Sequence, residues 1–164
     1  MKYFSKTALA AFATICFALP PIAARAGDDQ VVLTIDGAIA GGTSPDFTIE
    51  QLEALGTQVI ETSTPWHEGV VKFEGVPLAK LMDYVGANGE TVYVVALNNY
   101  STEIPIADFA AHGVILASRK DGALMPVSDK GPLFVIYPFD AKPELNSELY
   151  YSRSAWQVRQ ITIE

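Results

Sequence analysis

The segment from Thr64 to Gly86 constrains the fold more than any other part of the chain, because it fixes where a loop ends and a helix begins. Residues 64–75 are polar and aromatic, and they predict a loop that closes at Gly75. Pro77 is predicted at the first helical position, where its missing N–H costs nothing. The helix is predicted to end at Gly86, and its apolar residues recur at helical spacing, which predicts one buried stripe: Leu78, Leu81, Met82 and Val85.

Trp66 and His67 lie in this predicted loop, close to the start of the helix. Loops that are held by a neighbouring element often carry binding residues, so one interpretation places both side chains at a pocket. The other interpretation has Trp66 cover the core and His67 lie at the surface. The spacing of the residues leaves both interpretations open.

Short β-rich runs outnumber helical patterns in the rest of the chain. Thr48 and Gln51 have the spacing of a capping box, which predicts a short helix over residues 49–55. Residues 91–97 are nearly all apolar, which predicts a strand buried on both faces. In the last segment, 155–163, the alternation changes phase, and this predicts a bulge near Gln160. Because strands and helices do not alternate regularly, we expect one α+β domain with a mixed β-sheet and short helices.

The first 26 residues have the pattern of an export signal. Lys2 and Lys6 precede a mostly apolar run, and the sequence Ala24-Arg25-Ala26 is a small-x-small cleavage site. We therefore expect residues 1–26 to be removed and residues 27–164 to act in the periplasm or outside the cell, with no membrane insertion after cleavage. The chain's single cysteine, Cys16, lies in the predicted signal, so the mature chain would contain no cysteine.

The charge of the predicted mature chain limits its partners. Removal of three of the 11 basic residues leaves 8, against 19 acidic residues, so the formal net charge becomes −11. Such a surface repels phosphate backbones and anionic lipids, and we expect neither nucleic acid nor a membrane surface as a partner.

The chain also lacks the residues that several classes of catalysis require. No G-x-S-x-G motif is present, and the absence of cysteine from residues 27–164 removes thiolate nucleophiles. The two histidines, His67 and His112, are too few for a three-histidine zinc site, and we expect no metal site built from protein side chains. His112 precedes Gly113, which predicts a position at the C-terminus of a helix.

Polar side chains follow the predicted strand 91–97. Residues 98–103 are expected to form a loop, and Asn98 and Tyr100 are its candidate binding residues, because loops after buried strands often carry sites. A plain polar loop without a binding function is an equally good interpretation.

Several motifs in this order resemble the oxidoreductase molybdopterin-binding domain of the sulfite oxidase family. The motifs are Thr34-Ile35-Asp36-Gly37, Phe47 to Leu52, Trp66 followed by Gly75-Val76-Pro77-Leu78, Asp121-Gly122, Gly131-Pro132-Leu133, Tyr137-Pro138 and Ser152-Arg153-Ser154-Ala155-Trp156. The resemblance spans nearly all of residues 27–164. It implies a sulfite oxidase-like fold, a molybdopterin cofactor and redox chemistry.

The chain departs from this family at the metal ligand. The family's cysteine thiolate lies ahead of the motif tryptophan, where this chain has Glu61-Thr62-Ser63-Thr64, and hydroxyl groups are hard, weakly ionised ligands. Basic residues that could hold the cofactor's phosphate are also sparse. Arg153, beside Trp156, is the best anion-binding candidate, and its alternative role is an ion pair with an acidic side chain.

Two functions are consistent with these residues. In the favoured one, the domain has lost molybdenum chemistry and holds no cofactor. The former cofactor cleft then binds a small molecule, with anions among the candidates, or a periplasmic protein partner, through Trp66, His67, Asn98, Tyr100, Arg153 and Trp156. In the alternative, the protein is a periplasmic oxidoreductase that holds molybdopterin without a cysteine ligand. The missing thiolate favours the first.

Overall fold

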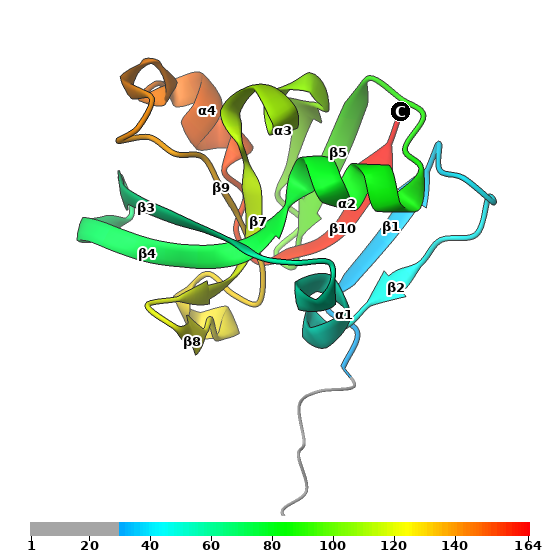
Figure 1. Ribbon diagram of the computed structural model, residues 1–164, viewed down its shortest axis with the longest axis horizontal. Helices are drawn as coiled ribbons and strands as arrows, with labels where there is room; N and C mark the ends of the chain where they lie inside the picture. Colours follow the sequence, from blue (N-terminus) through cyan, green and yellow to red (C-terminus); the bar gives the residue numbers. More distant parts are fainter. Residues whose placement is uncertain (1–29) are drawn as a thin grey trace, which may run out of the picture.

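The computed structural model describes residues 30–164, so the predicted export signal, with Cys16, lies outside the described residues. The chain folds into two five-stranded sheets with short helices packed around them (Figure 1). This confirms the α+β class with mixed pairing and short helices. The prediction of one sheet was wrong, because the strands divide between two. Among the described residues, no helix is long and apolar enough to cross a membrane.

The first sheet contains both ends of the described chain. Its strand order is β2-β1-β10-β5-β6, and β1 and β10 are parallel while the other pairs are antiparallel. The register shifts between Val158 and Gln160, which confirms the predicted bulge. The strands are β1 (Leu33–Gly37), β2 (Asp46–Phe47), β5 (Thr91–Ala96), β6 (Ser101–Pro105) and β10 (Val158–Ile163).

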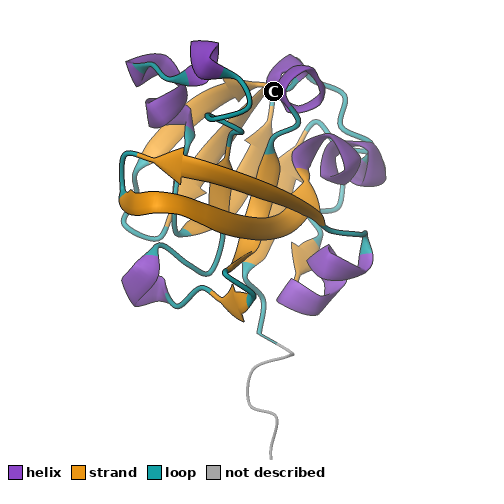
Figure 2. Ribbon diagram, turned by 60° about the vertical axis from the view of Figure 1, so that its left-hand side comes forward, coloured by secondary structure: helices purple, strands orange, loops and turns teal. Residues whose placement is uncertain are grey.

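The second sheet is antiparallel throughout, with the order β3-β4-β7-β8 and with β9 also paired to β7. Its long β3–β4 hairpin crosses in front of the strands of the first sheet in Figure 2. The strands are β3 (Gln58–Thr64), β4 (His67–Pro77), β7 (Ile115–Lys120), β8 (Ala123–Leu124) and β9 (Phe134–Ile136).

The predicted loop over residues 64–75 was wrong, because most of it is strand β4. Val71 and Phe73 are buried and alternate with the exposed Lys72, the pattern of a strand with one face on the core. Near the start of β4, Glu68, Gly69 and Val70 are all exposed, and this run concealed the alternation in the sequence.

The strands that are buried on both faces are β7 and β9, not β5. Along β7, Leu116 packs in the larger apolar cluster while Ile115 and Ala117 pack in a second one. Strand β5 instead alternates, and the Tyr93 side chain is 37% exposed. The prediction of a doubly buried strand at 91–97 was therefore wrong, because a run of apolar residues does not reveal which faces other elements cover.

The helices follow local signals in the sequence. The capping box is present, since Thr48 accepts from the Gln51 N–H and Gln51 accepts from the Thr48 N–H. All four residues of the predicted apolar stripe are buried, and Gly86 ends their helix in a left-handed conformation. Pro77, predicted at the first helical position, is instead the residue before the helix. The α-helices are α1 (Ile49–Ala54), α2 (Leu78–Val85), α3 (Ala107–His112) and α4 (Glu148–Arg153), and the 3-10 turns are η1 (Val127–Asp129) and η2 (Pro143–Leu145).

Candidate functional site

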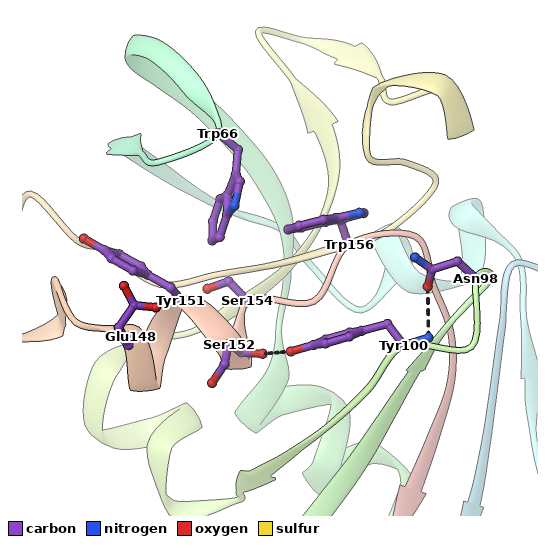
Figure 3. Close-up of a pocket in the computed structure, with 8 residues that line it drawn as sticks. All are labelled: Trp66, Asn98, Tyr100, Glu148, Tyr151, Ser152, Ser154 and Trp156. Carbon is purple, nitrogen blue, oxygen red and sulfur yellow. Dashed lines mark hydrogen bonds between the residues drawn. The ribbon is translucent and has the colours of Figure 1, made fainter.

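A cavity of about 290 Å³ opens between the β3–β4 turn, the β5–β6 turn and helix α4. This volume is at the lower end of the range for ligand pockets, roughly 300–1,000 Å³, so the cavity suits a small molecule. Aromatic rings form most of its wall (Figure 3). The lining residues are Trp66, Asn98, Tyr100, Glu148, Tyr151, Ser152, Ser154 and Trp156.

Trp66 reaches the cavity from the tight turn between β3 and β4. Its ring centroid lies 5.4 Å from that of Trp156 and 6.1 Å from that of Tyr151, and both pairs are edge-to-face. The ring also packs against Phe134, at 5.6 Å, so one side of Trp66 belongs to the core and another faces the cavity. Both interpretations of Trp66 from the sequence therefore describe part of its environment.

Tyr100 is held across the cavity by two hydrogen bonds. Its hydroxyl donates to the carbonyl oxygen of Ser152 at 2.7 Å, and its N–H donates to Oδ1 of Asn98 at 3.0 Å (Figure 3). Asn99 lies between them in a left-handed conformation, with φ of 64°. The loop predicted over residues 98–103 ends at Tyr100, because Ser101 begins β6.

Helix α4 supplies lining residues that the sequence analysis missed. Glu148, Tyr151 and Ser152 are three and four residues apart, which places them on one face of the helix. That spacing could have identified them, had a helix been predicted over residues 148–153. Ser154 follows the helix, and its hydroxyl donates to the Tyr150 carbonyl oxygen at 2.9 Å.

The cavity carries negative charge. Glu148 is the one acidic side chain in the lining, and it is exposed to solvent. The serine hydroxyls that line the cavity are already donating to backbone carbonyls, Ser152 to Leu149 at 2.7 Å and Ser154 to Tyr150 at 2.9 Å. The described lining therefore offers rings and one carboxylate, and no cationic side chain for an anion.

His67, predicted at the cleft, lies outside the cavity lining. Its Nδ1 is 2.8 Å from the Thr64 hydroxyl, and its ring packs 5.5 Å from that of Phe73, centroid to centroid. Burial lowers the pKa of the His67 imidazole below its ordinary value of 6.5, and the charges of Lys120 and Lys130 lower it further. The residue therefore belongs to the core next to Trp66, because its position in β4 turns it toward the apolar side of the sheet.

Arg153, the predicted anion-binding residue, also lies outside the lining and is already paired. Its Nη1 lies 2.8 Å from Oδ2 of Asp108, and the two side chains are only 16% and 14% exposed. The guanidinium also lies 5.6 Å from the Tyr150 ring centroid. The alternative that the sequence left open, an ion pair with an acid, is the one that the fold contains.

His112 lies at the C-terminus of α3, as predicted, with Gly113 in a left-handed conformation at the cap. Among residues 30–164, no group of three or more His, Cys, Asp or Glu side chains could hold a metal ion.

The hydroxyl groups that replace the family's thiolate are occupied within the protein. The Thr62 hydroxyl accepts from the Asp140 N–H at 3.0 Å and donates to the Ser63 carbonyl oxygen at 3.1 Å. The Ser63 hydroxyl bonds the Asp140 carboxylate, and Thr64 pairs with His67. Because these oxygens already have partners and residues 27–164 contain no cysteine, the chain does not fit a thiolate-ligated molybdenum cofactor.

The basic residues that could hold the cofactor's phosphate are likewise engaged. Lys120 pairs with Asp129, and the Arg159 Nε donates to the Ala96 carbonyl oxygen at 3.2 Å. Lys130 lies 4.8 Å from the ring centroid of Trp156 and does not line the cavity.

Comparison with known proteins places the chain in a family. The sulfane dehydrogenase SoxCD from Paracoccus pantotrophus is similar in structure, with a TM-score of 0.60 and 20% sequence identity, over 83% of this chain and 38% of that one. The chain thus spans well under half of SoxCD, and at this identity the likeness concerns the fold alone. No curated protein matches the sequence. The model of the oxidoreductase molybdopterin binding domain matches residues 26–140, and the chain therefore belongs to that family.

Proposed function

We propose that this protein is a ligand-binding member of the family that has given up molybdenum redox chemistry. The observation that carries the proposal is the cavity at Trp66, which has aromatic walls although no thiolate is available beside it. A concave, mostly apolar site with a few polar groups is the usual form of a small-molecule site. The export-signal pattern of residues 1–26 supports a role in the periplasm or outside the cell.

The polar and charged groups near the cavity support binding rather than catalysis. The hydroxyls of Thr62, Ser63 and Thr64 are held in internal hydrogen bonds and none of them lines the cavity, so none is placed to act on a molecule bound there. His67, the nearest imidazole in sequence to Trp66, is directed into the core. A bound molecule would therefore meet rings and a carboxylate and no acid–base pair.

The first test is a cofactor assay on protein purified from a molybdenum-replete host that exports it. We expect far less than one molybdenum per chain, and no fluorescent pterin after oxidation. A molybdopterin enzyme of the same host, purified in parallel, controls for cofactor supply. Near-stoichiometric molybdenum with pterin would overturn the proposal in favour of a cofactor-dependent oxidoreductase.

Ligand binding can be followed by intrinsic fluorescence, because the chain contains two tryptophans and both line the cavity. A ligand in the cavity is therefore expected to change the emission of the whole protein. A small-molecule library is screened by this signal and by thermal shift, with Tyr151→Ala as the variant that opens the wall. Tyr84→Ala is the matched control, since Tyr84 is 63% exposed and lies outside the cavity.

A further inference from the structure

The four aromatic rings of the cavity surround its volume on several sides. Trp66 meets Trp156 at 65° and Tyr151 at 79°, so these three rings form walls at steep angles to one another. Tyr100 adds a fourth wall, and its hydroxyl bond to Ser152 fixes the ring's position. Figure 3 shows Trp156 above Tyr100, with Tyr151 to the left. Such an arrangement presents the faces and edges of several rings to one small group.

The charges around these four rings favour a cation. The face of an aromatic ring carries negative electrostatic potential, and a cation within about 6 Å of a ring centroid is attracted to it. Glu148 adds a full negative charge at the wall. Trp156 already attracts one cation, because Lys130 lies 4.8 Å from its ring centroid. Lys130 is not among the lining residues, so its ammonium contacts the Trp156 ring without lining the cavity.

The faces of the four rings offer no lone pair to an N–H donor, and this selects the kind of cation that lies among them. A primary ammonium carries three N–H donors that must each find an acceptor when water is removed. The oxygen acceptors of the lining are the carbonyl oxygens of Ser152 and Asn98, which each hold one bond from Tyr100, and the Glu148 carboxylate, so a primary ammonium would pair with these groups and not lie against the ring faces. A quaternary ammonium has no N–H to satisfy, and its methyl groups pack against aromatic rings.

We propose that the cavity binds a quaternary ammonium compound, with the methylated nitrogen among the rings of Trp66, Trp156, Tyr151 and Tyr100 and with Glu148 facing its charge. The proposal rests on the ligand-binding function proposed above and names the chemical class of the ligand. It also revises the expectation of an anionic ligand, because the described lining contains no cationic side chain.

The test compares choline with 3,3-dimethyl-1-butanol, in which carbon replaces the charged nitrogen and the shape is retained. Tryptophan fluorescence and calorimetry are measured on the full mature chain. We expect choline to bind saturably and the neutral analogue to bind roughly tenfold more weakly, because only the cation gains the attraction of the rings. Equal binding of the two would overturn the proposal, as would the absence of any choline signal.

Two charge variants sharpen the test, since replacing the acidic Glu148 and replacing the basic Lys130 should change choline binding in opposite directions. Glu148→Gln should weaken choline binding by about two- to fivefold, the range for one exposed charge contact. Lys130→Gln should strengthen it by about twofold, because it removes a like charge next to the Trp156 ring. A merely structural disturbance would weaken binding in both, and that result would count against the proposal.

Ring variants separate the aromatic wall from the hydrogen bond. Tyr100→Leu should weaken choline binding by about three- to fivefold, whereas Tyr100→Phe keeps the ring and should bind nearly as well. Tyr84→Leu, outside the cavity, should not change it. Thermal melts of the unliganded variants show that each is folded.

If choline and its neutral analogue bind equally, the quaternary ammonium proposal fails while ligand binding stands. Stoichiometric molybdopterin would instead refute the ligand-binding function itself.

Discussion

Replacing Arg153 with methionine should destabilise the protein, because Arg153 neutralises an acid inside the fold. Its Nη1 lies 2.8 Å from Oδ2 of Asp108, in a pair whose side chains are 16% and 14% exposed. The Tyr137 hydroxyl, which is fully buried, donates to the same carboxylate oxygen at 3.1 Å. Without Arg153 the Asp108 carboxylate would keep this neutral donor and lose its counter-charge.

The size of the effect follows from the burial. Removing one partner of a buried ion pair costs about 3–5 kcal/mol, since the remaining charge is left uncompensated. The remaining exposure of Asp108 and the Tyr137 bond place this pair at the lower end, so we expect a loss of about 3 kcal/mol in the free energy of unfolding. For a domain of this size, that loss corresponds to a fall in Tm of about 10 °C.

Urea unfolding followed by tryptophan fluorescence measures this loss. The matched variant is the double replacement Arg153→Met with Asp108→Asn, which removes the stranded charge and should recover part of the lost stability. Phosphate should not raise the Tm of the wild-type protein more than it raises that of the Arg153→Met variant. A stable Arg153→Met variant, together with phosphate stabilisation of the wild type alone, would refute the argument and restore Arg153 as an anion-binding residue.

Three further predictions concern local features of the fold. Thr48→Ala should cost about 1 kcal/mol by removing the cap of α1, measured by urea unfolding. Gly75→Ala should prevent folding or lower the free energy of unfolding by more than about 3 kcal/mol, because the added Cβ would lie 2.0 Å from the Leu116 carbonyl oxygen. Gly69→Ala is the control: its Cβ would meet nothing within 4 Å, and the variant should lose only about 1–2 kcal/mol because of the positive φ. The pKa of His67 is lowered in the folded protein, so the unfolded chain binds a proton on this imidazole more readily than the folded chain does. The stability that the neutral imidazole contributes is therefore lost as the pH falls below about 6.5. His67→Phe should therefore lose less stability between pH 7 and pH 5 than the wild type, and an unchanged slope would contradict this.

Local features were predictable from the sequence because their causes lie within a few residues. The capping box of α1, the buried stripe of α2 and the left-handed Gly86 depend on side chains and caps inside one turn of helix. The bulge in β10 was also visible, because a change in the alternation of apolar residues has to be accommodated within the strand.

Pairing between distant strands decided what the sequence left hidden. Strand β4 was predicted as a loop, since its sequence begins with polar residues and glycine. It is a strand because β3 and β7 pair with its two edges. The number of sheets and the burial of β7 on both faces have the same origin, because they depend on which elements pack against a strand and not on its own residues.

The candidate site shows the same division. Its aromatic and amide residues were identifiable by type and by their position after strands, and the fold brings Trp66, Asn98, Tyr100 and Trp156 to one cavity. The fold alone directed His67 into the core, paired Arg153 with Asp108 and added the face of α4 with Glu148. A side chain's chemistry is set by its sequence, whereas the partner that it meets is set by contacts between segments far apart in the chain. That is why the family and the missing thiolate could be recognised from the sequence, and the negative charge of the cavity could not.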